Sequence, residues 1–526
     1  MGETLLIRFS VGDALLTFTH GVIVNFGGQS MTRQTTRRAY VILGAALGLA
    51  LPGAPQAAAP AQAASRVGPE ALAGAAPAVV RLADLPTRWF TAHRGAGAYL
   101  APENTEEAFA DGVADADADL LEFDVQVLTD GAGAIFHDLT VDRITTSTGN
   151  VTDLDSGKFK ALTIDAHSWF GGTAADTHPM LLDEFLDEFA GKKALLAHPK
   201  DTAAMRLVIR EITRRDLGDR VRIQTFSRSD AVLAKNAGLQ VQVLVGGAEQ
   251  ALTDTPAAVK ADGLKYVSLW QGLPDATIKA YVAAGLTVSC YDVDRQYRRD
   301  QLYKLGVVGI DGNDPGYVSG DAAAYRRTGD PFGTRRYWYG HLSQTQNAAN
   351  VSATYRGSFT PPGWWSIPRG TSPLFVRQGW AVPPSRTSYV LHAWMRYDAL
   401  GSDATRWAGV YFSARYDHAF NDAGNKLNSG YTAILRQNGS LELYRKDPTA
   451  TVLLKKVATP AVKAGTTAKI SIQVSATTVY AHRYDVTSTA VSASDGTYRG
   501  AYIYLGRAAA AGAQGPGVSF DNVAFF

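Results

Sequence analysis

Side chains suited to acid-base chemistry and phosphate binding follow short apolar runs in the first half of this 526-residue chain. They are His93 and Arg94 after WFTA, Glu122 and Asp124 within LLEFDVQV, His137 and Asp138 after GAIF, and His198 and Lys200 after KALLA. In a parallel α/β barrel the reacting groups lie at the carboxyl ends of the strands, so these side chains are expected to share one mouth.

The residue types in this set indicate one kind of reaction. Glu122 and Asp124 are two residues apart, so both point to the same face of one strand. Carboxylates gathered at one mouth repel one another, and a divalent cation relieves the repulsion. Two histidines that titrate near neutral pH can divide the roles of general base and general acid. Because an arginine and a lysine suit a phosphate, the set predicts metal-assisted hydrolysis of a phosphate ester.

The segment from Trp89 to about Val318 alternates β-rich runs with helical patterns such as LLDEFLDEFAG, which predicts βαβ units around a parallel sheet. We count nine candidate strands, close to the eight of a TIM barrel. One short run, KYVSLW, is therefore expected to be peripheral. The predicted fold class is an α/β TIM barrel over residues 86–327.

The sequence after about Arg327 loses helical periodicity and becomes rich in Trp, Tyr, Ser, Thr and Gly. Runs such as SYVLHAWMRYD and GYTAILRQ alternate apolar and polar residues, and QNGS between two runs is typical of a hairpin turn. Residues 328–526 are therefore expected to form an all-β sandwich of jelly-roll type.

The N-terminal segment is expected to direct export. Arg37 and Arg38 precede an apolar run from Tyr40 to Leu51, followed by small residues, as in a twin-arginine signal. Because the residues before Met31 fit poorly ahead of a signal, residues 1–65 are interpreted as a misassigned start, the signal and a processed segment. Residues 66–85 are interpreted as a flexible lead-in. The apolar run is shorter than a membrane span, so a secreted protein is expected rather than an integral membrane one.

The charge balance, 51 Lys and Arg against 49 Asp and Glu, argues against nucleic acid as a partner.

Several motifs in a fixed order resemble the glycerophosphodiester phosphodiesterase family over roughly residues 86–320. These are HRG, PENT, ExD, HD, a strand ending in lysine, IQTFS and GVVGIDGNDP. The resemblance implies a TIM barrel in which the neighbouring glycerol hydroxyl attacks phosphorus and water then opens a cyclic phosphate. The roles it implies are acid-base catalysis by His93 and His137, metal binding by Glu103, Glu122 and Asp124, and phosphate binding by Arg94 and Lys200.

One position departs from the family pattern, because the fourth strand ends His198-Pro199-Lys200 where the family has Glu-x-Lys. The family implies Ca²⁺ or Mg²⁺, and an imidazole ligand would shift the preference towards Mn²⁺ or Zn²⁺. We expect His198 to be a ligand. The alternative is that it only forms hydrogen bonds and that metal binding is weaker or lost.

Three further residues are candidates for the pocket. Tyr291 stands where the family commonly has tryptophan, and Trp270 either lines the pocket or packs against the core. Asp138 is expected to support the site or to contact a substrate hydroxyl. Asn313, which precedes Asp314 in the last motif, is given little weight.

The expected function is a secreted, metal-dependent enzyme that hydrolyses glycerophosphodiesters to glycerol 3-phosphate and an alcohol. The ending VSFDNVAFF resembles the last strand of concanavalin-like and laminin-G-like sandwiches, so a glycan is a candidate partner of the second domain. Three alternatives remain open: a phospholipase D-like activity on lysolipids, a diesterase acting on a glycerophosphate wall polymer, and a carbohydrate-binding protein with an inactive barrel.

Overall fold

The computed structural model describes residues 80–95, 101–115, 117–166, 176–320, 358–360, 364–371, 374–377, 388–417, 429–487, 490–507 and 513–525, together with two short strands near the N-terminus. The chain divides into two compact units, Met1–Gly68 and Pro69–Phe526. In the first unit, β1 (Ser10–Val11) pairs antiparallel with β2 (Ala14–Leu15). The predicted export signal and the predicted domain boundary at 327/328 lie outside the described residues.

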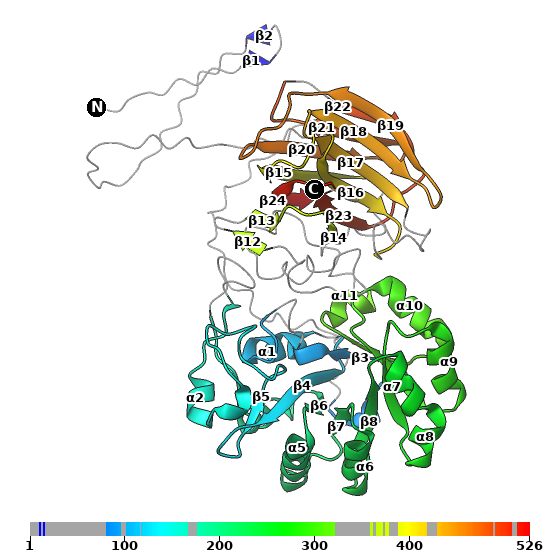
Figure 1. The fold of residues 1–526 in the computed structure, drawn as a ribbon. Coiled ribbons are helices and arrows are strands. Elements are labelled where there is room, and N and C mark those ends of the chain that lie inside the picture. Colours follow the sequence, from blue (N-terminus) through cyan, green and yellow to red (C-terminus); the bar gives the residue numbers. More distant parts are fainter. Residues whose placement is uncertain are drawn as a thin grey trace, which may run out of the picture. The chain divides into compact units, whose positions relative to one another are not determined.

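A closed parallel barrel forms the first part of the second unit and confirms the predicted TIM-barrel fold (Figure 1). Its strands are β3 (Trp89–Ala92), β4 (Leu120–Val127), β6 (Ala194–Pro199), β7 (Val221–Thr225), β8 (Gln240–Val245), β9 (Tyr266–Trp270), β10 (Thr287–Tyr291) and β11 (Gly309–Gly312). The strands pair in sequence order, and β3 pairs with both β4 and β11, which closes the ring.

Helices follow the strands, as the alternating pattern predicts. They are α1 (Glu106–Ala114), α2 (Ser156–Lys160), α4 (Leu182–Phe189), α5 (Thr202–Arg214), α6 (Arg228–Asn236), α7 (Ala248–Thr253), α8 (Pro256–Ala261), α9 (Asp275–Ala283), α10 (Gln296–Leu305) and α11 (Pro315–Ser319), with short 3-10 turns η1 (Leu82–Asp84), η2 (His93–Gly95) and η3 (Val151–Asp153). Helix α5 illustrates why such segments form helices, with a capping residue at its start and one apolar face. The Asp201 carboxylate accepts from the Ala204 N–H at its start, and Met205, Val208 and Ile212 bury one face.

The prediction that KYVSLW is peripheral is wrong, because this run forms β9 between β8 and β10. The strand outside the parallel ring is β5 (Gly133–Ile135), which pairs antiparallel with the end of β4. The turn between β4 and β5 contains Asp130-Gly131, with Gly131 at φ +83°, and it reverses the chain as a hairpin. His137 and Asp138 therefore reach the barrel mouth from a hairpin and not from a barrel strand.

The C-terminal part consists of antiparallel sheets, as predicted. One sheet has the order β12 (Ser358–Thr360), β13 (Trp364–Ile367), β24 (Gly517–Phe525), β15 (Tyr389–Ala399), β20 (Thr467–Val474), β21 (Thr478–Arg483) and β22 (Ala490–Ser494). The other has the order β14 (Leu374–Arg377), β23 (Tyr502–Arg507), β16 (Trp407–Ala414), β17 (Gly430–Arg436), β18 (Ser440–Lys446) and β19 (Thr451–Ala458). Side chains of both sheets, including Leu391, Met395, Val410, Leu443 and Leu505, share one core, so the sheets pack face to face. The jelly-roll assignment stays a prediction.

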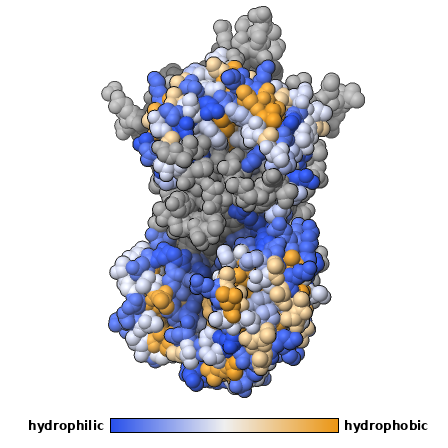
Figure 2. Space-filling model, turned by 45° about the vertical axis from the view of Figure 1, so that its right-hand side comes forward, coloured by the Kyte–Doolittle hydropathy of each residue, from blue (hydrophilic) through white to orange (hydrophobic). Residues whose placement is uncertain are grey.

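The surface of the described residues carries few large exposed apolar side chains. In the barrel these are Leu139, Phe226 and Leu252, and on the face drawn in Figure 2 apolar residues form small separate groups among hydrophilic ones. No helix in the described part of the chain combines the length and the apolar character needed to cross a membrane.

Candidate active site

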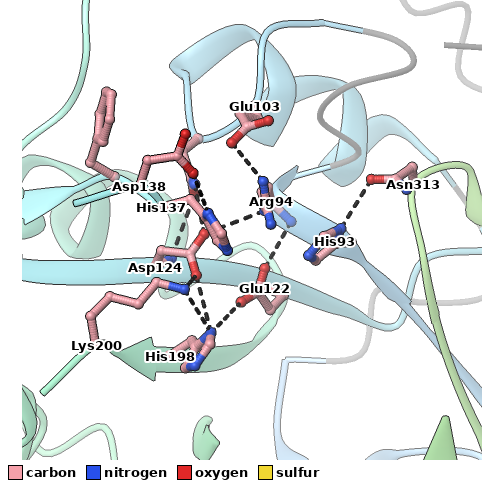
Figure 3. Close-up of polar contacts among 12 residues, drawn as sticks. His93, Arg94, Glu103, Glu122, Asp124, His137, Asp138, His198, Lys200 and Asn313 are labelled. Carbon is pink, nitrogen blue, oxygen red and sulfur yellow. Dashed lines mark hydrogen bonds and ion pairs between the residues drawn. The ribbon is translucent and has the colours of Figure 1, made fainter. Parts of the chain in front are cut away.

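The acidic pair of β4 lies at the centre of the site, and both carboxyl groups are almost fully buried (Figure 3). Glu122 Oε2 accepts from the backbone N–H of Arg94 at 2.9 Å, and Glu122 Oε1 accepts from Gln224 Nε2 at 3.0 Å. Gln242 Nε2 in turn donates to Gln224 Oε1 at 3.0 Å. Burial, together with the neighbouring Asp124, raises the pKa of Glu122 to about 8. A chain of amides from β7 and β8 therefore fixes this carboxyl group inside the barrel.

Three of the predicted metal ligands converge. One donor atom each from Glu122, Asp124 and His198 lies within 4.8 Å of the other two, and all three residues are buried. His198 Nδ1 is 3.1 Å from Asp124 Oδ1 and 3.8 Å from Glu122 Oε1. Burial and the neighbouring Lys200 lower the pKa of His198 to about 4, so its ring is neutral and can offer a lone pair. Two carboxylates and a neutral imidazole fit one divalent cation.

Lys200 lies directly on this cluster. Its Nζ is 2.5 Å from Asp124 Oδ1 and 3.1 Å from His198 Nδ1. Because of Lys200 and the neighbouring His137, the pKa of Asp124 is well below its usual value although burial alone would raise it. The ammonium group thus neutralises the same donor atoms that a metal ion would use, and a bound cation would compete with Lys200 for Asp124.

Glu103, the fourth predicted ligand, has different partners. Its Oε1 accepts from Arg94 Nη1 at 2.7 Å and from Arg143 Nη2 at 2.6 Å, and its Oε2 accepts from Arg143 Nη1 at 2.9 Å. Burial alone would raise the pKa of this carboxyl group, but the two guanidinium groups lower it to about 2. The predicted role of Glu103 as a metal ligand stays a prediction, and the structure shows it as an anchor for two arginines.

The backbone of the loop after β3 adopts an unusual, left-handed conformation at Arg94. Arg94 has φ +50°, and Gly95 follows at φ +80°. A Cβ on Gly95 would lie 2.6 Å from the Phe109 ring and 2.8 Å from the Phe109 backbone nitrogen, so only glycine fits there. In the PENT motif, Asn104 Nδ2 donates to Asp124 Oδ2 at 2.8 Å, and the Asn104 N–H donates to the Arg94 carbonyl at 3.1 Å. The HRG and PENT motifs therefore lie together over the acidic pair.

His93 follows β3 and is held through its Nδ1 atom, which is 3.0 Å from Asn313 Oδ1. The Asn313 amide nitrogen donates to Asp294 Oδ2 at 2.9 Å, and the Asn313 backbone N–H donates to Asp294 Oδ1 at 2.8 Å. Burial and the adjacent Arg94 lower the pKa of His93, and they outweigh the opposing effect of Asp292, whose Oδ1 is 3.8 Å away.

His137 is also held through Nδ1, here by the Asp138 carboxylate, with 2.6 Å between Nδ1 and Oδ1. Arg143 Nε donates to the other Asp138 oxygen at 2.5 Å. Burial alone would raise the pKa of Asp138, but His137 and Arg143 lower it below its usual range. Asp138 thus contacts and orients His137. Arg143 donates hydrogen bonds to both Asp138 and Glu103 and so links these two carboxylates.

Aromatic rings stand beside the metal-ligand cluster. Phe226, which is 45% exposed, lies 5.7 Å from the His198 ring and edge-on to the Tyr291 ring at 6.3 Å between centroids. The Tyr291 hydroxyl is buried and has no hydrogen-bond partner among the described residues. Trp270 packs against the barrel core, and a Cβ on Gly272 would lie 2.4 Å from its ring. Tyr291 with Phe226, rather than Trp270 alone, forms the aromatic side of the site.

The structure thus brings together residues from four segments of the barrel: His93, Arg94, Glu122, Asp124, His137, His198 and Lys200. Sequence reasoning missed Arg143, Asp294 and Gln224, and it undervalued Asn313. The motif IQTFS contains Gln224, but only the fold shows that its amide contacts Glu122. No sequence signal marks Arg143 or Asp294. Arg143 binds Glu103, which is 40 positions away in the chain, and Asp294 binds Asn313, whose residue type does not by itself indicate a functional role.

Comparison with known proteins agrees with this geometry. Residues 93–317 match the model of the glycerophosphoryl diester phosphodiesterase family. The chain contains a domain of this family. Its match spans the segment from the HRG loop to α11, which holds every residue of the site described above.

Two bacterial relatives show how far the similarity of the phosphodiesterase domain extends. The Bacillus subtilis protein YhdW is 38% identical over 112 residues, which are 21% of this chain and 44% of that protein. A glycerophosphodiester phosphodiesterase of Caldanaerobacter subterraneus is 27% identical over 232 residues, which are 43% of this chain and 93% of that relative.

Among solved structures, an Oleispira antarctica phosphodiesterase in complex with sn-glycerol-3-phosphate is 20% identical, with a TM-score of 0.38, and the match covers 45% of this chain and 96% of that one.

Proposed function

We propose that the barrel is a metal-dependent phosphodiesterase that hydrolyses glycerophosphodiesters to glycerol 3-phosphate and an alcohol. The observation that carries this proposal is the joint placement of two Nδ1-anchored histidines, Arg94 and Lys200 around the cluster of Glu122, Asp124 and His198 (Figure 3). The family of the domain and the name of the Caldanaerobacter relative support the same substrate class.

The residues of the site would divide the reaction among them. Arg94 and Lys200 would bind the phosphate oxygens, since both cations lie on the acidic cluster and are only slightly exposed. His93 and His137 would move protons, one ring taking the proton from the glycerol hydroxyl that attacks phosphorus and the other giving a proton to the leaving alcohol. Glu122, Asp124 and His198 would hold the metal, which when bound supplies positive charge to the phosphate.

The decisive experiment measures release of glycerol 3-phosphate and choline from glycerophosphocholine by the purified full chain. Activity is recorded after chelation and again after Ca²⁺, Mg²⁺, Mn²⁺ or Zn²⁺ is restored singly. His93→Ala should abolish release, and His482→Ala in β21 serves as a matched histidine control outside the barrel. Release that does not need a metal, or that survives His93→Ala, would contradict the proposal.

The same assay separates the enzyme alternatives. Lysophosphatidylcholine and a glycerophosphate polymer are offered at equal phosphodiester concentration. We expect the soluble diester to react fastest, because only three large apolar side chains are exposed among the described barrel residues, namely Leu139, Phe226 and Leu252. Faster turnover of the lysolipid would favour the phospholipase D-like alternative.

We further propose that the sandwich binds a glycan. Support comes from a groove of about 420 Å³ across β15, β20, β21 and β22, whose lining residues include Gln473, Tyr480 and Ser492. Sugar hydroxyls pair with such groups, and the Tyr480 ring offers a stacking face. Co-sedimentation of the full chain with insoluble cell-wall glycan tests this proposal, and Tyr480→Ala should release the chain from the pellet. Equal sedimentation of the variant would contradict it.

Secretion remains part of the proposed function. It is supported by the paired Arg37 and Arg38 ahead of an apolar run. Expression of the gene from Met31 should place the mature chain in the medium, and Lys replacement of both arginines should retain it in the cell. Equal export of the variant would exclude the twin-arginine route.

A further inference from the structure

Helix α10 starts beside the active site and is capped by a residue from the C-terminal part of the chain. Its N-cap residue, Arg295, makes no capping hydrogen bond through its side chain to any described residue. The backbone N–H groups of Gln296 and Tyr297 instead donate to the Asp417 carboxylate, at 2.6 Å to Oδ2 and 3.0 Å to Oδ1. A carboxylate also suits the positive end of a helix dipole. The sandwich thus supplies the cap of a barrel helix.

Asp417 is almost fully buried and lies in a segment that hydrogen bonds tie to the sandwich. It follows β16, and the carbonyl of the preceding Tyr416 accepts from the Tyr504 hydroxyl of β23 at 3.1 Å. The Arg415 N–H donates to the Ser429 carbonyl at 2.8 Å. The carboxylate is therefore presented to α10 from a backbone that the sandwich fixes.

Two further side chains of the sandwich reach the start of α10. Tyr502, the first residue of β23, donates its hydroxyl to Gln296 Oε1 at 2.8 Å and packs against the barrel core. The rings of Tyr297 and Tyr416 lie 5.2 Å apart between centroids. Barrel and sandwich belong to one compact unit of the chain. Within that unit, the first turn of α10 is bound by a carboxylate, a hydroxyl and an aromatic ring of the sandwich.

A short loop joins the start of α10 to the active site. Residues 292–295 connect the end of β10 to the helix. Asp292 Oδ1 lies 3.8 Å from His93 Nδ1. The Asp294 carboxylate accepts from the side chain and the backbone N–H of Asn313, at 2.9 and 2.8 Å. Because the loop is so short, its two aspartates must follow any movement of the first helical turn.

Loss of the cap would disturb this turn, because its N–H groups have little access to water. Gln296 is only 8% exposed, so a backbone N–H that loses Asp417 cannot simply turn to solvent. A buried donor without an acceptor is costly, and the helix relieves the cost by opening or shifting its first turn. Residues 292–295 would then lose the position that brings their side chains to the barrel mouth.

We propose that the sandwich completes the active site of the barrel, because Asp417 caps α10 and thereby holds the two aspartates of residues 292–295 at the mouth. This inference rests on the proposed phosphodiesterase function. Asp417 is a positioning residue, since it acts only through α10. The metal-ligand cluster lies on β4 and β6, whereas β10 lies between β9 and β11. Asp417 should therefore affect turnover and leave metal binding unchanged.

Asp417→Ala in the full chain tests the inference. We expect kcat for glycerophosphocholine to fall roughly 5- to 30-fold, the range by which loss of a helix cap shifts a local equilibrium. KM should change little, and the Mn²⁺ affinity in calorimetric titration should stay that of the wild type. Asp403→Ala is the matched control, since Asp403 accepts from Thr405 and pairs with Arg406 within the sandwich. An unchanged kcat in Asp417→Ala, or weaker Mn²⁺ binding, would overturn the inference.

A second substitution separates capping from general damage to the fold. Arg295→Ser places a capping hydroxyl at the N-cap of α10 itself. Combined with Asp417→Ala it should restore most of the lost kcat, and alone it should match the wild type. A loss of activity that this hydroxyl does not restore would contradict the capping role. Asp417→Asn keeps the shape and one acceptor oxygen, so it should lose less activity, and it serves as the test if the alanine variant does not fold.

Amide hydrogen exchange tests the same contact without turnover. In Asp417→Ala the amides of residues 292–297 should exchange roughly tenfold faster than in the wild type, whereas those of β7 should not change. Equal protection of residues 292–297 in both proteins would overturn the inference. A wild type without activity on glycerophosphocholine would instead refute the proposed function, and the exchange rates would still decide whether Asp417 fixes this loop.

Discussion

Glu103 provides the sharpest test of how the site is held together. The side chain is almost fully buried and receives three hydrogen bonds from two arginines, one from Arg94 and two from Arg143. These guanidinium groups outweigh the effect of burial and lower the pKa of Glu103 from an ordinary 4.5 to about 2. The perturbation is Glu103→Gln, which keeps the shape and removes the charge.

The magnitude follows from linkage between protonation and folding. The difference between 4.5 and about 2 corresponds to about 3 kcal/mol of folding free energy at neutral pH. Because the folded-state pKa is lowered, this stabilisation is present above pH 4.5 and is lost as the pH falls towards 2. We therefore expect Glu103→Gln to lower the free energy of unfolding of the barrel by about 3 kcal/mol at pH 7, with the difference shrinking at acid pH.

The assay is urea unfolding followed by circular dichroism at 222 nm, which reports on the barrel because the described helices lie within residues 82–319. Glu188→Gln is the matched control, since Glu188 forms an exposed ion pair with Lys192 and should contribute less than about 1 kcal/mol. Calorimetric titration with Mn²⁺ is run on the same proteins. Unchanged stability together with at least tenfold weaker metal binding would refute the reasoning and support Glu103 as a ligand.

Three further substitutions probe the same site. His198→Glu should raise affinity for Ca²⁺ or Mg²⁺ relative to Mn²⁺ in calorimetric titrations, because it restores an oxygen ligand, and an unchanged preference would argue against a ligand role. Lys200→Met should slow hydrolysis of glycerophosphocholine roughly 10- to 100-fold, because a charged phosphate contact is lost. The same variant should bind the metal more tightly, because Asp124 loses its ammonium partner. Weaker metal binding by the variant would contradict this. Gly95→Ala should lower the barrel's free energy of unfolding by about 2–5 kcal/mol, since it adds left-handed strain to overlap with Phe109, and a stable variant would show that the loop can rearrange.

The barrel could be predicted from the sequence because helical and strand patterns alternate regularly through it. The error over β5 and β9 has a specific cause. GAIFHD and KYVSLW are apolar runs of similar length, and such a run does not reveal whether its strand pairs parallel or antiparallel. The Asp130-Gly131 pair was the available signal, because a short turn with glycine at positive φ joins antiparallel strands and not parallel ones.

The partners of the catalytic candidates could not be predicted in the same way. Motifs place His93 and His137 at the mouth, but the groups that set their proton states depend on contacts between distant segments. Asn313 reaches His93 across 220 positions of the chain, and Arg143 reaches Glu103 across 40. Residue type alone gave Asn313 little weight, although its amide contacts His93 on one side and Asp294 on the other.

Strained backbone positions lie beside these contacts at the barrel mouth. Arg94, Asn104 and Asp292 are three of the non-glycine residues with positive φ, at +50°, +58° and +56°. Each unfavourable conformation accompanies a contact that a relaxed backbone would lose. The Arg94 N–H reaches Glu122, the Asn104 amide reaches Asp124, and the Asp292 carboxylate lies within 4 Å of His93.

Strain of this kind costs of order 1–3 kcal/mol for each residue and persists only where the surroundings enforce it. Around this site the enforcing groups are the buried carboxylates of β4, which bind the loops through hydrogen bonds. The acidic pair therefore has a structural role beside its proposed role in metal binding. It holds the HRG and PENT motifs in the strained form that places Arg94 and His93 at the barrel mouth.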